Sequence, residues 1–364
     1  MERKIVIFYS IPAHGHIRPA LNLLKSLAQN YNITVYSTLE FKSLIEQSGF
    51  KFVPYKNIEN IDLSVGSRPL ELSLLLLKFA YENMGRFIDD CFVYKPSLIF
   101  FDTLALWGRL VSEILRVPSV SINTFQVCYK FGSKLFLEYM KQFSVKSLSQ
   151  IKFVRAIHRY KKYIHSSFGV KPGCLLPVLF NRGCLNVFTY PRSMHYDAKS
   201  LDDTCFFVGP CSVEDFDQSD KSNLVYISLG TIFNKNMSLY QHLFKKFQNS
   251  GLDVVVSCGE FYETLRVYEA RYPNVCVRKF VNQSEVLSKA RLFVSSGGMN
   301  SVCESMAKKV PIIVFPQQGE QRINYKRLKQ LGLKQDGTFD VYPLGFDILN
   351  IEGFTEKVRR LEHI

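Results

Sequence analysis

The feature that most constrains the fold is a pattern of short apolar segments alternating with helical ones, which occurs twice along the 364 residues. In the first block the predicted strands are Lys4–Tyr9, Ile33–Ser37, Ser97–Phe101 and Ser119–Ile122. In the second block they are Leu224–Thr231, Asp253–Ser257, Val275–Val277, Leu292–Ser295 and Ile312–Phe315. Strands that alternate with helices form parallel sheets covered by helices. The predicted fold class is therefore α/β, with two Rossmann-like, doubly wound domains facing across a cleft.

An acidic segment separates the two blocks. Val208-Gly209-Pro210 leads into residues 212–223, which hold few apolar side chains. We therefore expect a first domain at 1–211, an acidic linker at 212–223 and a second domain at 224–364. Within the linker, Asp215-Phe216-Asp217 has an Asp-x-Asp form that can hold a divalent metal. Because it lies in a charged run and not at a strand end, we favour a solvated linker and expect no metal site.

The formal net charge of +14 indicates an anionic partner, which charge alone does not identify. No nucleic-acid-binding motif accompanies the charge, so nucleic acid is not expected. Residues 130–171 contain ten Lys or Arg and one acid. Within them, Ile151–His165 has the pattern of a basic amphipathic helix. This segment predicts peripheral contact with an anionic membrane.

The sequence contains no transmembrane or secretory signal that we recognise. No run of about 18 uncharged apolar residues occurs, and the apolar start is a strand pattern without a cleavage site. The nine cysteines include no Cys-x-x-Cys pair, which favours reduced thiols. We expect a cytoplasmic protein that is peripheral at the membrane.

A glycine-rich turn follows the strand at Leu292–Ser295 and opens a helix at Ser296-Gly297-Gly298-Met299-Asn300-Ser301. Small residues there let a phosphate approach the N–H groups of the helix start, and Glu304, one turn on, could bind ribose hydroxyls. An ordinary strand-to-helix turn explains the same residues. The sequence alone leaves both interpretations open.

Two further loops end strands of the second block at the same expected sheet edge. Ser228-Leu229-Gly230-Thr231 ends the first strand, and Pro316–Asn324 follows the last. Adjacent Glu320 and Gln321 could hydrogen-bond several sugar hydroxyls, or they could cap the following helix.

Histidines follow the first strand of the chain, in Ala13-His14-Gly15-His16-Ile17-Arg18-Pro19. We expect them in a loop before a helix at Pro19–Gln29. Their spacing without a third ligand disfavours a metal, whereas acid–base work with Asp102, at another strand end, is chemically reasonable. Either residue could instead cap a helix.

Together these motifs resemble the UDP-glycosyltransferase family with the GT-B fold, and most closely its bacterial macrolide-type members. The similar stretches are His14–Pro19, Val225–Asn234, Phe280–Leu287 and Phe293–Asn324. The resemblance implies an inverting, metal-independent hexosyltransferase without a cofactor. It implies a nucleotide-sugar donor, with UDP-glucose the expected one, and a lipophilic small-molecule acceptor.

The resemblance also implies roles for individual residues. His16 would be the general base on the acceptor hydroxyl, and Asp102 would pair with it. The implied nucleotide contacts are Thr231, Phe280, Val281, Gln283, Ser296, Gly298, Asn300, Ser301 and Glu304, with Phe280 stacking on the base. Glu320 and Gln321 would bind the donor sugar.

Two departures from the family pattern motivate an alternative function, while His16, Asp102, Glu320 and Gln321 favour the enzyme. Ser296 stands where the family usually has a histidine that reaches the diphosphate, and the second domain is expected to be short at its C-terminus, without the final helix that crosses back to the first domain. The alternative is a catalytically weak nucleotide-binding protein or an activator of a partner.

Overall fold

The structure is a computed structural model that describes residues 3–56, 68–142, 148–173, 181–210, 222–230, 236–332 and 351–362. The chain forms two compact units. The first comprises Met1–Arg192, Asp197–Cys211 and Asp347–Ile364, and the second comprises Ser193–Tyr196 and Ser212–Phe346. Most of the predicted linker, residues 212–221 of 212–223, lies outside the described residues.

The first unit contains a parallel sheet of seven strands in the order β3-β2-β1-β4-β5-β6-β7. The strands are β1 (Lys4–Tyr9), β2 (Tyr31–Ser37), β3 (Lys51–Pro54), β4 (Leu98–Asp102), β5 (Ser119–Asn123), β6 (Leu185–Phe188) and β7 (Cys205–Phe207). The helices are α1 (His14–Lys25), α2 (Lys42–Gln47), α3 (Pro69–Tyr94), α4 (Leu106–Leu115), α5 (Lys134–Gln142), α6 (Leu148–Phe168) and α12 (Ile351–Leu361).

The second unit contains a parallel sheet of five strands in the order β10-β9-β8-β11-β12. The strands are β8 (Leu224–Ser228), β9 (Asp253–Ser257), β10 (Val275–Arg278), β11 (Ala290–Ser295) and β12 (Ile312–Val314). The helices are α7 (Met237–Phe247), α8 (Tyr262–Leu265), α9 (Gln283–Lys289), α10 (Met299–Ala307) and α11 (Gly319–Leu331). All strand pairs in both units are parallel, so the predicted α/β class is confirmed.

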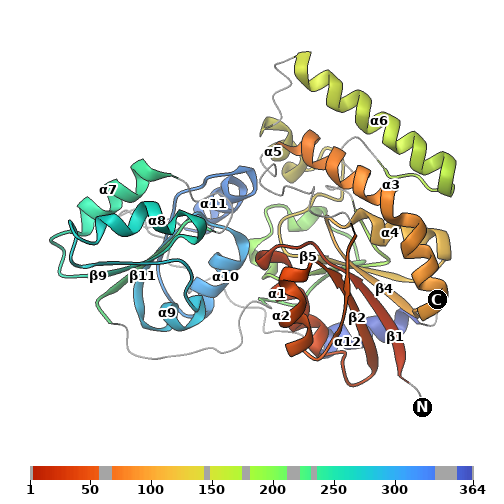
Figure 1. Ribbon diagram of the computed structural model, residues 1–364, viewed down its shortest axis with the longest axis horizontal. Helices are drawn as coiled ribbons and strands as arrows, with labels where there is room; N and C mark the ends of the chain where they lie inside the picture. Colours follow the sequence, from red (N-terminus) through yellow and green to blue (C-terminus); the bar gives the residue numbers. More distant parts are fainter. Residues whose placement is uncertain are drawn as a thin grey trace. The chain divides into compact units, whose positions relative to one another are not determined.

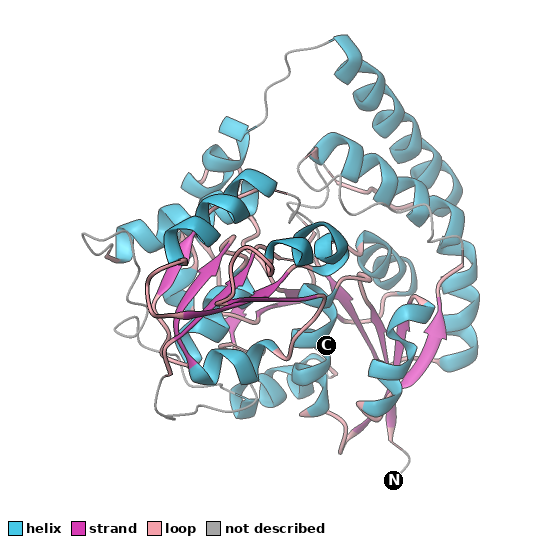
Figure 2. Ribbon diagram, turned by 60° about the vertical axis from the view of Figure 1, so that its left-hand side comes forward, coloured by secondary structure: helices cyan, strands magenta, loops and turns pink. Residues whose placement is uncertain are grey.

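Helices cover both faces of the first sheet, because its strands are apolar on both faces. Alternate residues such as Val6 and Phe8 pack with α1, α2 and α12. The residues between them face the opposite side, where Gly108 of α4 lies so near Phe101 that a Cβ on this glycine would be 2.4 Å from the Phe101 Cβ. Figure 2 shows strands enclosed by helices in this way.

The last helix corrects the predicted domain limits. Residues 347–364 are predicted to lie in the second domain, but they belong to the first unit. The expectation that no final helix crosses back to the first domain is therefore wrong as well, because α12 lies in that unit. Phe354 and Val358 of α12 are fully buried in the core that contains α1 and β1. Figure 1 shows α12 in the same part of the first unit as α1 and β1. An amphipathic pattern shows that one helix face is buried, but not which sheet buries it, and the prediction went wrong at this point.

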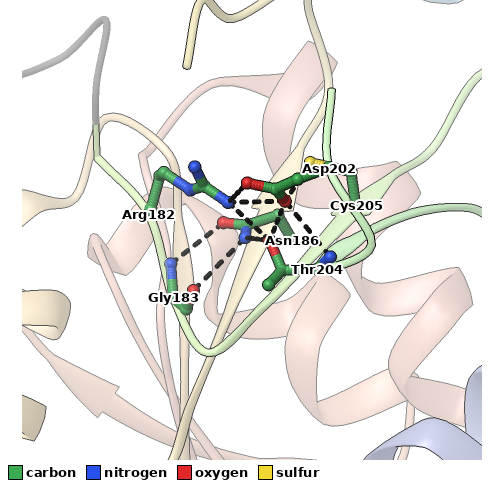
Figure 3. Close-up of polar contacts among 6 residues, drawn as sticks. All are labelled: Arg182, Gly183, Asn186, Asp202, Thr204 and Cys205. Atoms are coloured by element: carbon green, nitrogen blue, oxygen red, sulfur yellow. Dashed lines mark hydrogen bonds and ion pairs between the residues drawn. The ribbon is translucent and has the colours of Figure 1, made fainter. Parts of the chain in front are cut away.

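A polar cluster joins two neighbouring strands of the first sheet, β6 and the edge strand β7. Arg182 donates to both carboxylate oxygens of Asp202, at 2.8 and 2.7 Å, and to Thr204 Oγ1 at 2.5 Å. Asn186 in β6 donates to Thr204 Oγ1 at 3.0 Å and also bonds the backbone of Gly183 (Figure 3). The cluster therefore fixes the entry to β6 against the entry to β7.

Candidate active site

The carboxyl edge of the first sheet brings together the two residues proposed for acid–base chemistry. Asp102 ends β4, and His16 lies after β1, its neighbour in the sheet. His16 Nδ1 is 2.8 Å from Asp102 Oδ2. The Asp102 side chain is 1% exposed and the His16 side chain 20%, so the carboxylate is enclosed while the imidazole reaches the surface.

His16 lies in a helix and not in the expected loop. Helix α1 begins at His14, so His16 is in its first turn, and Pro19 lies inside the helix. The predicted helix begins at Pro19, a residue type that is common at the first position of a helix. So near the N-terminus it removes only one intrahelical hydrogen bond. The first turn fixes the direction of the imidazole.

Neighbouring groups orient both members of the pair. The Leu104 N–H donates to Asp102 Oδ1 at 2.9 Å, so each carboxylate oxygen has its own donor. Thr124 Oγ1 lies 3.1 Å from His16 Nδ1, and the Phe125 ring packs against the imidazole with 5.7 Å between centroids. Since Nδ1 is held by the carboxylate, Nε2 is the nitrogen through which this histidine would accept a proton.

His14 is placed differently. Its Nε2 lies 3.8 Å from Glu40 Oε1, and its ring packs against Phe41. Burial and the nearby Arg18 lower the pKa of His14, an effect that Glu40 partly opposes. His14 therefore has surroundings separate from those of the His16–Asp102 pair.

The carboxyl edge of the second sheet brings together the loops predicted to hold the nucleotide. β8 and β12 pair with β11 on either side, so their loops are neighbours. A Cβ built on Gly230 would lie 3.6 Å from Ser296 Oγ. Asn324 of α11 donates to the Gly297 carbonyl at 3.0 Å. The strand order reverses direction at β8, the position where open α/β sheets bind ligands.

The two glycines of the turn, Gly297 and Gly298, have different surroundings. Gly297 has a φ of +80°, and a Cβ there would lie 2.4 Å from Val314 Cγ1, so the fold itself requires glycine. Gly298 has a φ of −59°, and a Cβ there would meet nothing within 4 Å. Gly298 is the N-cap of α10, and as a glycine it gives the helix start no side-chain hydrogen bond. The structure therefore leaves open space at Gly298, directly before a helix N-terminus.

Gln283 and Glu304, which were predicted separately, lie in contact. Gln283 Nε2 donates to Glu304 Oε2 at 2.7 Å, and Tyr226 OH donates to Gln283 Oε1 at 3.2 Å. Burial raises the pKa of Tyr226 to about 12, so its hydroxyl remains a donor at neutral pH. This chain of bonds orients the Glu304 carboxylate one turn into α10.

Glu320 and Gln321 start α11 and have separate partners. The side-chain oxygen of Gln321 accepts from the Gln317 and Gln318 N–H groups at 2.7 and 3.1 Å, and the residue is 5% exposed. The capping interpretation is therefore correct for this oxygen. Glu320 Oε1 accepts from Asn324 Nδ2 at 2.5 Å.

The other predicted nucleotide contacts take varied positions. Phe280 is 61% exposed before α9, and Val281, beside it, is partly buried. Ser296 is 3% exposed, whereas Asn300 and Ser301, in the first turn of α10, are partly exposed. Thr231 lies outside the described residues.

Sequence reasoning missed two residues that support these sites. Thr124 directly follows the carboxyl end of β5, and Asn324 stands one helical turn after Glu320. The sequence shows that Thr124 follows a strand end and that Asn324 is four residues after Glu320. It does not show which side chains these two residues contact.

Comparison with known proteins identifies the fold and the family. A sequence profile described as UDP-glucoronosyl and UDP-glucosyl transferase matches residues 178–339. The NDP-glycosyltransferase YjiC of Bacillus subtilis (strain 168) is 31% identical over 350 residues, which cover 92% of this chain and 84% of that protein. The oleandomycin glycosyltransferase of Streptomyces antibioticus is 24% identical over 343 residues, 90% of this chain and 78% of its own. The crystal structure of the glycotransferase of kitacinnamycin superposes with a TM-score of 0.75 at 22% identity, covering 100% of this chain and 96% of that one.

The two parallel-sheet units thus have the GT-B architecture of glycosyltransferases. The chain belongs to the UDP-glycosyltransferase family, as the resemblance predicted.

Proposed function

We propose that the protein transfers a hexose from a UDP-sugar, with UDP-glucose the expected donor, to a hydroxyl group of a lipophilic small molecule. Transfer inverts the anomeric carbon and uses no metal ion or cofactor. The observation that carries this proposal is the 2.8 Å contact between His16 Nδ1 and the buried Asp102 carboxylate. It provides a proton acceptor of fixed orientation at the expected acceptor side.

In the proposed reaction, His16 Nε2 takes the proton of the acceptor hydroxyl while the oxygen attacks the anomeric carbon. The bond from that carbon to the diphosphate breaks, and UDP leaves with the electron pair. Asp102 stabilises the imidazolium until the proton passes to solvent. Because attack and departure occur on opposite sides of the carbon in one step, the product has the inverted configuration.

The donor assignment is supported by the second unit. Helix α10 begins directly after the open space at Gly298, and the backbone N–H groups of its first turn would stabilise the charge growing on the diphosphate. Gln283 would orient Glu304 toward the ribose. The family profile names UDP-sugar transferases, and this supports UDP as the nucleotide.

The acceptor assignment is supported by the relatives. The names of two of them mention oleandomycin and kitacinnamycin. We therefore extend to this chain an acceptor class of lipophilic small molecules with a free hydroxyl. Phe125, packed against His16, would provide an apolar contact beside the base.

The test is release of UDP from UDP-glucose in the presence of macrolide or phenolic acceptors, with and without EDTA. We expect acceptor-dependent release that EDTA leaves unchanged and that His16→Ala abolishes. His14→Ala is the matched control, and it should retain most of the activity. Normal turnover by His16→Ala would refute the assignment of the base. UDP binding without turnover on any acceptor would favour the nucleotide-binding or activator alternative.

A further inference from the structure

Helix α6 presents a basic surface that glycosyl transfer does not use. Ile157 and Ile164 are fully buried, and they fix one side of the helix against the first unit. Tyr160 and Tyr163 pack with Tyr81 of α3 at centroid distances of 6.0 and 5.6 Å. Figure 1 shows α6 lying along α3. The predicted amphipathic helix is therefore present, and its apolar side is buried.

Four cations occupy the opposite side of α6. Lys152, Arg155, Arg159 and Lys162 are all exposed. At 3.6 residues per turn, their positions fall within an arc of about 80° around the helix axis. They therefore form one stripe along the solvent-facing side, which we call the α6 stripe.

The charge of this stripe is uncompensated nearby. The sequence from Leu148 to Phe168 contains no Asp or Glu. Among the residues that the structure describes, none of the four cations forms an ion pair with a carboxylate. By contrast, the exposed Lys78 of the neighbouring helix α3 pairs with Glu82 one turn away. An anionic surface would thus meet cations already available to it.

Apolar groups accompany the charge. Ile151 and Tyr163, both 41% exposed, border the α6 stripe on its two sides. A hollow of about 400 Å³ lies along one border, and the described residues that line it include Val154, Ile157, His158 and Lys161. Cations beside exposed apolar side chains are typical of a helix that lies in the headgroup region of a bilayer. A soluble polyanion would use the charge but not the apolar groups.

We propose that the α6 stripe docks the protein onto membranes rich in anionic phospholipids. Each Lys or Arg near such a leaflet strengthens binding about fivefold. The apolar border would add contact with the acyl region, which makes binding only partly dependent on charge. The described residues include no helix long and apolar enough to cross a bilayer, and docking of this kind requires none. The proposal is independent of the glycosyl-transfer reaction.

The test is co-sedimentation of the full chain with vesicles of phosphatidylcholine, alone or mixed with phosphatidylglycerol. We expect binding to the mixed vesicles that weakens with added salt, because the attraction is screened. Arg155→Glu combined with Lys162→Glu should weaken binding at least about 25-fold, the loss of two cations. The milder pair Arg155→Gln with Lys162→Gln should lose about the same, and it guards against a helix disrupted by acidic residues.

The matched control is Lys245→Glu combined with Lys246→Glu on exposed positions of α7, which changes the net charge equally. This control should weaken vesicle binding far less than the α6 pair. Equal loss in both double variants would overturn the proposal, because net charge alone would then explain binding. Absence of binding to anionic vesicles at low salt would overturn it as well, as would tighter binding to a duplex RNA than to the vesicles.

Discussion

Asp102→Asn is the substitution that separates a positioned base from a merely buried ion pair. Asp102 Oδ1 accepts the Leu104 N–H at 2.9 Å, so the oxygen of the asparagine amide should remain there. The NH2 group then faces His16 Nδ1, 2.8 Å away in the native chain. A donor at this position forces Nδ1 to accept and moves the imidazole proton to Nε2. The nitrogen that should take the acceptor proton is then already protonated.

The magnitude follows from the lost charge interaction. Two opposite charges about 4 Å apart attract by about 4 kcal/mol at an effective dielectric constant of about 20. Because the imidazolium exists only as the reaction proceeds, this attraction stabilises the transition state and not the ground state. Its loss should lower kcat about 1,000-fold. The KM for UDP-glucose should change little, since the proposed donor contacts are in the other unit.

The assay is steady-state UDP release with saturating acceptor. Asp90→Asn is the matched control, because Asp90 also accepts a side-chain hydrogen bond at a partly buried site, from Tyr36 OH at 2.8 Å, and the substitution changes the charge equally. Unfolding temperatures of both variants exclude global destabilisation as the cause. If Asp102→Asn keeps kcat within about fivefold of the native value, less than about 1 kcal/mol of the interaction serves catalysis and the reasoning is refuted.

Three further experiments, with four substitutions, test the fold and the donor site. Gly298→Ala should raise the KM for UDP-glucose on the order of tenfold with little change in unfolding temperature. Gly297→Ala should instead cost about 1–3 kcal/mol of stability, because of the positive φ and the clash of the new Cβ with Val314. The opposite pattern would contradict the open space at Gly298. Phe354→Ala should lower the unfolding free energy of the first unit by about 3–5 kcal/mol, measured by urea denaturation, and a change under about 1 kcal/mol would contradict the burial of α12. Hydrogen bonds from Arg182 and Thr204 lower the pKa of Asp202 to about 2. The ionised Asp202 therefore stabilises the folded chain fully at pH values above 3.8, its pKa in the unfolded chain, and this stabilisation is lost as the pH falls toward about 2. The native chain should therefore lose more thermal stability across that interval than Asp202→Asn, and parallel losses would show that the pair contributes nothing.

The strands were predictable because buried parallel strands are nearly continuous apolar runs. Lys4–Tyr9 and Asp253–Ser257 have the same limits in sequence prediction and structure. The chemistry at the strand ends followed, since carboxyl ends of adjacent parallel strands share one edge. Asp102 and His16 could be paired on that basis.

What sequence patterns could not supply was the partner of each buried surface. The amphipathic face of α12 does not specify the sheet that covers it, so its unit was misassigned. Pro19 marks a helix start by local preference, yet α1 begins at His14. Gln321 could be a sugar ligand or a cap from its position, and only the structure shows its oxygen bonded to two backbone N–H groups.

The central claim is that His16, held by Asp102, activates an acceptor hydroxyl for direct displacement of UDP. The most direct test is the anomeric configuration of the product made from UDP-α-glucose, measured by NMR as the coupling constant between the anomeric proton and the proton on the neighbouring carbon. The account predicts the β-glycoside from the native chain and none from His16→Ala. An α-glycoside, or free glucose in place of a glycoside, would contradict it.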